Sequence, residues 1–174
     1  MVSGEISGRR VLLRPLLEDD VPVIASIAAE PSAQPWWTDP TESGVHAGLF
    51  AADTVAWAVI VDGEVAGAVS AFDTGWPVGS TMGVAIVLGG PWQDRGLGPE
   101  ALSLMIRHLI AARGIRRFTV DPASANSRAI RAYAALGFRA IGIARESEPA
   151  PGGEWRDCQL MDLLAREFAD RGDG

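Results

Sequence analysis

The stretch PWQDRGLGPEALSLMIRHLI, residues 91–110, decides the fold, because a glycine-rich turn in it opens directly into a helix pattern. It follows Met82–Leu88, a nearly all-apolar run that predicts a strand buried on both faces. The glycines carry no side chains that would block approach, and backbone N–H groups converge where the helix dipole is positive. Pro99 fits the first helical turn, where an N–H would have no partner. The stretch predicts either a site for an anion such as phosphate or a turn that binds nothing.

Strand and helix patterns alternate on both sides of this unit. Its own helix is expected over Ala101–Ala112, with Arg107 and His108 facing outward from an apolar stripe. The strands are expected at Arg9–Arg14, Val55–Val61, Glu64–Ala71, Met82–Leu88, Arg117–Val120, Phe138–Ala144 and Asp157–Leu163. The other helices are expected at Leu17–Ala29, Ser127–Leu136 and Leu164–Asp170, and a loop at Pro31–Gly44. The pattern predicts an α+β fold with a mixed, mostly antiparallel central sheet flanked by helices.

Length and composition favour a single domain over residues 1–174. The chain is 48% hydrophobic and 21% charged, which is ordinary for one globular domain. It has no apolar run of ~18 residues and no apolar segment near Met1 that would act as a secretory signal. We therefore expect a cytoplasmic protein without a membrane partner. One cysteine and two histidines predict neither an internal disulfide nor a metal site.

The charge pattern bears on the partner. The 15 basic residues are all arginine, and 22 acids give a formal net charge of −7. The absence of lysine excludes a Schiff-base lysine and a Walker A motif. An acidic surface repels nucleic acid and attracts cations, so a cationic small-molecule amine is the expected partner and nucleic acid is not. Solubility alone is the other explanation of the charge.

Two motifs together resemble the GNAT superfamily of acyl-CoA-dependent N-acetyltransferases. The first is Gln93-x-x-Gly96-x-Gly98, and the second is Asn126-x-x-Ala129-x-x-x-Tyr133-x-x-x-Gly137-Phe138. The resemblance covers nearly the whole chain. It implies a GNAT-like sheet with a splayed strand pair that binds the cosubstrate acetyl-CoA. The cofactor-binding residues that it implies are Ile86, Val87 and Leu88 along the thioester arm, Gln93, Arg95, Gly96, Leu97 and Gly98 at the pyrophosphate, and Asn126 at the pantetheine.

Pro99 departs from the family pattern, because it cannot donate an N–H where other members often do. A phosphate contact is then missing or is supplied by Arg95.

Tyr133 is the only tyrosine. The resemblance implies that its hydroxyl protonates the departing thiolate of coenzyme A, as a general acid. The alternative is a packed ring whose hydroxyl is satisfied by water.

The segment TVDPASANSRAIRAYAALGF, residues 119–138, and the pair Trp36–Trp37 resemble the aminoglycoside 6′-N-acetyltransferase branch. Asp121 matches the carboxylate that this branch places at the acceptor amine, where it would take or relay a proton or orient the ammonium. A structural Asp-Pro turn is the alternative. Substrate-binding residues are expected to be Trp36, Trp37, Asp73 and Trp76, although Met82–Leu88 lacks an acid that such enzymes often carry.

The resemblance thus implies an acetyltransferase in which an amine of an aminoglycoside attacks the thioester directly, an activity that would confer antibiotic resistance. Two alternatives remain open. The opening RRVLLRPLLEDDVPVI, residues 9–24, is similar in style to ribosomal-protein N-acetyltransferases, which modify a protein N-terminus. A non-catalytic acyl-CoA-binding module is the other alternative, which the presence of both Asp121 and Tyr133 disfavours. The protein is expected to be a monomer or a homodimer.

Overall fold

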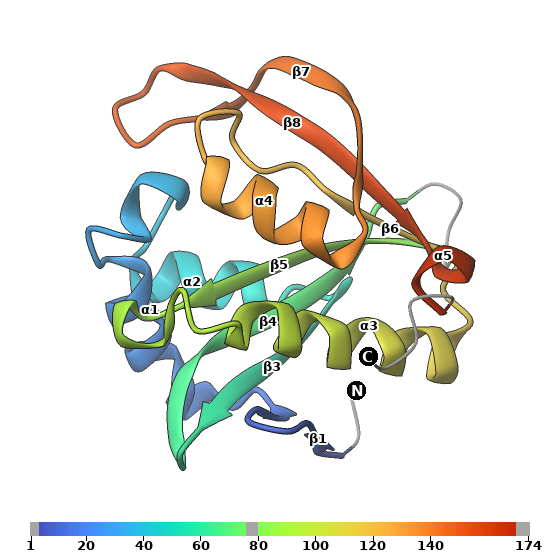
Figure 1. Cartoon of the computed structure of the whole chain (residues 1–174). Coiled ribbons are helices and arrows are strands. Elements are labelled where there is room, and N and C mark those ends of the chain that lie inside the picture. The colour runs from blue at the N-terminus through green and yellow to red at the C-terminus, as the bar shows by residue number, and fades with distance from the viewer. Residues whose placement is uncertain (1–3, 76–79, 170–174) are drawn as a thin grey trace.

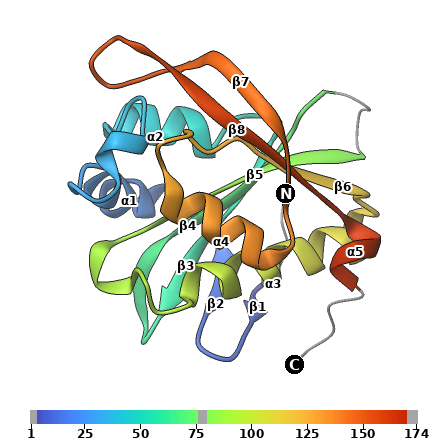
Figure 2. The ribbon, with the colours of Figure 1, turned by 45° about the horizontal axis from the view of Figure 1, so that its top comes forward.

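The computed structural model describes residues 4–75 and 80–169, which build one mixed sheet with helices on both faces (Figures 1 and 2). The sheet has eight strands in the order β1-β2-β3-β4-β5-β6-β8-β7. Its neighbouring strands are antiparallel except β5 and β6, which run parallel. The predicted α+β class with a mostly antiparallel sheet is confirmed.

The elements have the following bounds. The strands are β1 (Ile6–Ser7), β2 (Leu12–Pro15), β3 (Thr54–Val61), β4 (Glu64–Asp73), β5 (Thr81–Leu88), β6 (Arg117–Val120), β7 (Arg139–Pro149) and β8 (Trp155–Leu164). The α-helices are α1 (Val21–Ala28), α2 (Glu42–Leu49), α3 (Leu97–Arg113), α4 (Ser127–Leu136) and α5 (Ala165–Ala169). Three short 3-10 helices are η1 (Glu18–Asp20), η2 (Gln34–Trp36) and η3 (Gly90–Trp92). Within the described ranges, no helix has the length and apolarity that crossing a membrane requires.

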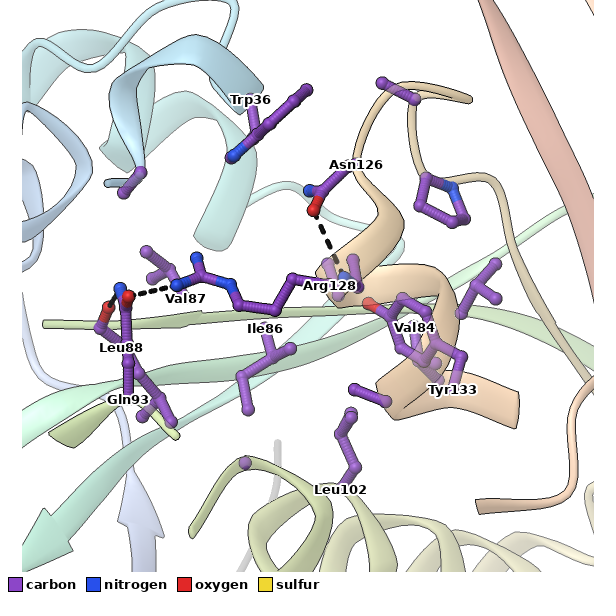
Figure 3. A pocket seen from close by; sticks show the side chains of 18 of the residues that line it. Trp36, Val84, Ile86, Val87, Leu88, Gln93, Leu102, Asn126, Arg128 and Tyr133 are labelled. Carbon is purple, nitrogen blue, oxygen red and sulfur yellow. Dashed lines mark hydrogen bonds between the residues drawn. The ribbon is translucent and has the colours of Figure 1, made fainter. Parts of the chain in front are cut away.

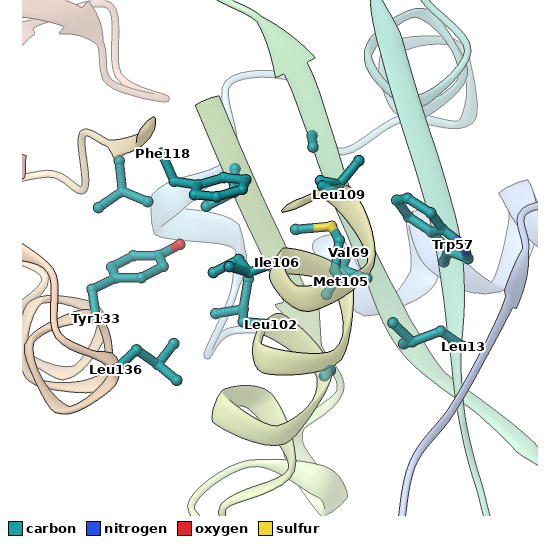
Figure 4. Close-up of a cluster of buried hydrophobic side chains, with 14 of the residues drawn as sticks. Leu13, Trp57, Val69, Leu102, Met105, Ile106, Leu109, Phe118, Tyr133 and Leu136 are labelled. Atoms are coloured by element: carbon teal, nitrogen blue, oxygen red, sulfur yellow. The ribbon is translucent and has the colours of Figure 1, made fainter. Parts of the chain in front are cut away.

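Two apolar cores hold the helices on the sheet, because each strand sends alternate side chains to opposite faces. On one face, α3 and α4 pack on the larger core, which contains Trp57, Leu102 and Phe118 (Figure 4). On the other face, α1 and α2 pack on a smaller core that contains Ile24 and Val45. The central strands are therefore covered on both sides.

Strand β5 separates from β6 after a short paired stretch. It pairs with β4 as far as Leu88, but with β6 only over Thr81–Gly83. Gly83 stands at the fork, where a Cβ atom would lie 2.3 Å from Cε2 of Phe72. From Val84 onward, the edge of β5 that faced β6 has no strand partner. The splayed strand pair that the family resemblance implied is present.

Helix α2 was not predicted, and His108 does not lie where the sequence placed it. The segment expected to be a loop, Pro31–Gly44, contains η2 and the start of α2. The Thr41 hydroxyl caps α2 by accepting a hydrogen bond from Gly44 N at 3.2 Å, and Val45 is buried. His108 does not face outward as predicted: it is half-buried, and its ring meets Trp57 edge-on with centroids 5.8 Å apart.

The β7–β8 hairpin is longer than the predicted strands. β7 continues five residues beyond the expected end at Ala144, as far as Pro149, and it forms the outer edge of the sheet. Figures 1 and 2 show the hairpin arching beyond the sheet toward the segment that carries η2. This extension brings residues near position 150 close to a loop from the first quarter of the chain.

Candidate active site

A cavity of about 620 Å³ opens at the fork between β5 and β6 (Figure 3). Its walls come from β5, the glycine turn before α3, the start of α4, the segment after β6, the η2 segment and the β7–β8 hairpin. The predicted site residues that line it are Trp36, Trp37, Ile86, Val87, Leu88, Gln93, Gly96, Gly98, Asp121, Asn126 and Tyr133. The fold therefore gathers into one cavity residues from widely separated parts of the sequence.

The glycine turn forms one end of the cavity. Gly96 has φ = 75°, the left-handed conformation that favours glycine, and α3 begins at the next residue. A Cβ atom on Gly98 would lie 3.4 Å from Leu88 Cδ1 and 3.5 Å from Ile86 Cδ1, so it would fill the approach to the helix terminus. Free N–H groups at a helix start suit a phosphate. The turn fits the pyrophosphate of acetyl-CoA.

Two predicted cofactor residues do not line this cavity. Arg95 lies 5.3 Å from the centroid of the Trp92 ring, and its Nη1 donates to the Pro91 carbonyl at 3.4 Å. Leu97 is 2% exposed and belongs to the larger core. The Leu97 side chain contributes packing, so the group it offers to a phosphate is its backbone N–H at the start of α3, and the Arg95 guanidinium lies over the Trp92 ring.

Gln93 links the turn to two other parts of the wall. Its Nε2 donates to the Leu88 carbonyl at 2.7 Å and to Ser32 Oγ at 3.1 Å. Its Oε1 accepts a hydrogen bond from Nη1 of Arg128, which reaches over from α4 (Figure 3). Sequence reasoning did not single out Arg128, because one arginine among several near the start of a helix carries no distinguishing signal.

Asn126 directly precedes α4, and Tyr133 lies within it. Asn126 Oδ1 caps the helix by accepting from Ala129 N at 3.1 Å. Tyr133 is 7% exposed, and its ring packs against Phe138 with centroids 5.5 Å apart. Its hydroxyl points into the cavity and has no hydrogen-bond partner among the described residues (Figure 3). Burial, and then the charge of Asp121, raise the pKa of this hydroxyl well above its usual range, so it stays protonated at neutral pH.

Asp121 comes directly after β6 and keeps contact with solvent at the cavity wall. Desolvation by the surrounding atoms, and then the nearby charge of Glu148, raise the pKa of its carboxyl above the usual value. A carboxylate whose pKa moves toward neutrality becomes a better proton acceptor at pH 7. The direction of this shift favours Asp121 as a proton acceptor, and its role as a base stays a prediction.

Two further charged residues line the same end of the cavity, Glu148 on β7 and Arg156 on β8. Arg156 Nη2 lies 2.8 Å from Glu148 Oε2. The one sequence signal that could have pointed to Glu148 and Arg156 is their position shortly after the second motif. Nothing in their spacing predicted the length of that hairpin.

One predicted acceptor residue, Asp73, is not gathered here. Asp73 pairs with Met82 at the first end of β5, whereas the cavity lies at the last end, and Asp73 lines a separate cavity. Its Oδ1 accepts from Gly75 N at 2.7 Å. Trp76 lies outside the described residues. Within residues 4–75 and 80–169, no group of three or more His, Cys, Asp or Glu side chains could hold a metal ion.

The family model described as an acetyltransferase (GNAT) domain matches residues 10–139. The chain therefore belongs to the GNAT acetyltransferases, whose cosubstrate is acetyl-CoA. No curated protein sequence matches the chain significantly.

Solved structures agree with the fold. A protein from T. thermophilus classed as an acetyltransferase has a TM-score of 0.82 and 26% identity, covering 98% of this chain and 94% of its own. A GCN5-related N-acetyltransferase from Brucella melitensis has a TM-score of 0.79 and 25% identity, covering 95% and 80%. RimJ from Mycobacterium smegmatis, in complex with a CoA disulfide, has a TM-score of 0.78 and 19% identity, covering 97% and 93%. At that identity, RimJ supports the fold alone.

Gly98→Val is expected to weaken acetyl-CoA binding about tenfold to hundredfold, because the branched side chain would stand where phosphate oxygens approach and remove charge-assisted hydrogen bonds. The matched control is Gly48→Val, also in a helix but with open space around the added Cβ. Calorimetric titration with acetyl-CoA measures both. An unchanged affinity in a folded Gly98→Val variant would remove the phosphate site from this turn.

Proposed function

We propose that the chain transfers an acetyl group from acetyl-CoA to a primary amine of a cationic small molecule, an aminoglycoside or related amino sugar, at its 6′ nitrogen. The observation that carries the proposal is the placement of the Asp121 carboxylate and the Tyr133 hydroxyl in one cavity with the unpaired edge of β5. A proton acceptor and a proton donor are the two groups that amine acetylation requires.

We call the end of the cavity that is lined by Asp121, Glu148 and Trp36 the acceptor end, and its side chains suit a cation. Asp121 brings a carboxylate to this end, and Glu148 adds a second one whose charge Arg156 partly offsets. Trp36 and Trp37 supply aromatic surface that can contact the apolar faces of a sugar. The formal net charge of −7 also attracts cations from a distance. The choice of an aminoglycoside rests further on the resemblance in residues 119–138 and receives no support from Asp73.

The proposed reaction includes two proton transfers, one from the amine to Asp121 and one from Tyr133 to the sulfur. An alkylammonium has a pKa of ~10 and is almost wholly protonated at pH 7, so Asp121 takes or relays its proton before attack. The free amine then attacks the carbonyl carbon of the acetyl-CoA thioester and forms a C–N bond. The C–S bond breaks, coenzyme A leaves as a thiolate, and the nitrogen releases its second proton to solvent. Tyr133 then donates a hydrogen bond or a proton to the departing sulfur, and backbone N–H groups on the open edge of β5 orient the thioester arm.

The N-terminus of a protein is the second candidate acceptor, and the opening residues 9–24 favour it by their resemblance to ribosomal-protein acetyltransferases. An α-amino group has a pKa of ~8, so it needs less help from a base at neutral pH. Turnover that depends weakly on Asp121 would favour this acceptor over an amino sugar.

A thermal-shift panel with thiol-release assays tests the proposal. Acetyl-CoA alone should raise the melting temperature, since a ligand that binds only the native state stabilises it. Aminoglycosides should raise it further with unreactive coenzyme A present, and they should be acetylated with acetyl-CoA. Acetylation of N-terminal peptides alone would move the assignment to the second candidate. Binding of acetyl-CoA with no turnover of any amine would indicate a binding module.

A further inference from the structure

We propose that Arg156 is a positioning residue of the acceptor site, which holds Glu148 and the Pro35–Trp36 backbone in place at one end of the cavity. This inference rests on the proposed function in one respect, namely that this end of the cavity receives the amine.

The contacts of the Arg156 guanidinium join two distant segments. Its Nε and Nη2 lie 2.9 and 2.8 Å from Glu148 Oε2, and its Nη1 donates to the Pro35 carbonyl at 2.5 Å. The Trp36 ring centroid lies 5.9 Å from its Cζ. Arg156 and Pro35 are 121 residues apart in the chain. One side chain therefore fastens the β7–β8 hairpin to the η2 segment.

The same contacts organise the acceptor end. The Arg156 side chain is only 16% exposed, so solvent screens its ion pair with Glu148 less than it would at an open surface. The Nε and Nη2 contacts of Arg156 and the Cys158 Sγ contact at 3.6 Å all engage Oε2 of Glu148. The second oxygen, Oε1, has no partner among the described residues. Arg156 thus fixes the positions of this carboxylate and of the Trp36 ring.

Loss of Arg156 should affect the binding of the amine and not the binding of acetyl-CoA. The glycine turn is held by contacts of Gln93 with Leu88, Ser32 and Arg128, none of which involves the hairpin. Loss of the Arg156 contacts would loosen the wall formed by Trp36 and Glu148. The glycine turn would keep the contacts of Gln93 with Leu88 and Arg128, which do not depend on the η2 segment. Lysine cannot reproduce the arrangement, because a single ammonium lacks the planar fork that reaches two acceptors in fixed directions.

The test compares Arg156→Gln and Arg156→Lys with Arg117→Gln. Arg117 also donates from Nε to a carboxylate, Asp162 Oδ2 at 2.9 Å, but it does not line the cavity. For Arg156→Gln, we expect the KM for the amine to rise on the order of tenfold, with kcat within about threefold and acetyl-CoA affinity unchanged. Arg156→Lys should recover part of the loss, and the Arg117 variant should match the wild type.

Hydrogen exchange supplies a readout that needs no acceptor. The amides of Trp36 and Trp37 donate to the carbonyls of Ala33 and Gln34 at 2.9 and 3.2 Å, and Arg156→Gln should speed their exchange while Arg117→Gln does not. Unchanged exchange in the Arg156 variant overturns the positioning role. Faster exchange with an unchanged amine KM overturns its link to the acceptor. If the wild type acetylates nothing in the panel, the proposed function fails, and exchange still decides whether Arg156 holds the segment.

Discussion

Tyr133→Phe is expected to lower kcat about 10²-fold while leaving acetyl-CoA affinity nearly unchanged. The substitution removes one hydroxyl and keeps the ring, which packs against Phe138. The ring lies on the same side of the larger core as Leu102 (Figure 4). Because the hydroxyl has no partner among the described residues, its removal leaves no protein donor or acceptor unpaired. A fall in turnover without a fall in stability would therefore report on chemistry.

The expected loss lies at the low end of the range for general acids, ~10²–10⁴. Burial, and then Asp121, raise the pKa of the Tyr133 hydroxyl well above its usual range, so the hydroxyl holds its proton more tightly than a thiol does. Its contribution is then mainly a hydrogen bond to the developing thiolate. For the same reason, ionisation of Tyr133 should not limit wild-type activity on the alkaline side of the profile up to pH 9.

Thiol release measured from pH 6 to pH 9 tests this expectation. Phe138→Leu is a suitable control, because it alters the contact with the Tyr133 ring but keeps the hydroxyl. That variant should lose thermal stability more than turnover. Full activity in a folded Tyr133→Phe variant would mean that water or another group protonates the sulfur and that Tyr133 is a packing residue.

The elements that carry a local signal were predicted from the sequence. Ser127–Leu136 was predicted with its observed bounds, since Asn126 caps the helix and Gly137 ends it with φ = 105°. Helix α2 was missed because Gly44 and Gly48 weaken its pattern, and its short apolar face is defined only by packing against α1 and the sheet. Local propensity decides the first case and tertiary contact decides the second.

The site residues also fall into those that a local motif predicts and those that only tertiary structure places. Gly96 and Gly98 lie in the motif at the start of α3, and Tyr133 lies in the motif that contains α4. The structure brings these residues together in one cavity. Glu148 and Arg156 reach the cavity only because the β7–β8 hairpin extends beyond the sheet, which depends on pairing register. Register also explains Asp73: its partner is Met82, so it stands at the opposite end of β5. Pairing between strands is a property of the whole sheet and was not readable from single segments.

Asp121→Asn is expected to lower kcat/KM for a cationic amine by about 10²-fold or more at pH 7, with acetyl-CoA binding preserved. An ammonium with a pKa of ~10 cannot attack until its proton leaves, and the amide of asparagine cannot take that proton. The defect should shrink as the pH rises toward 10, because the amine then loses its proton to solvent. A loss of equal size at every pH would assign Asp121 to orientation or binding.

The acidic side of the pH profile gives a second, independent check on Asp121. Desolvation by the surrounding atoms and then the charge of Glu148 raise the pKa of its carboxyl, and a base works only when deprotonated, so wild-type activity should fall as the pH falls through this raised pKa. Glu148→Gln removes the negative charge that contributes to the shift and keeps Asp121 itself. The inflection of kcat/KM at this raised pKa should therefore move to lower pH in Glu148→Gln and be absent in Asp121→Asn, whose activity should follow only the loss of the amine's own proton toward pH 10. An inflection that stays in place in both variants would belong to another group, and Asp121 would then not be the base.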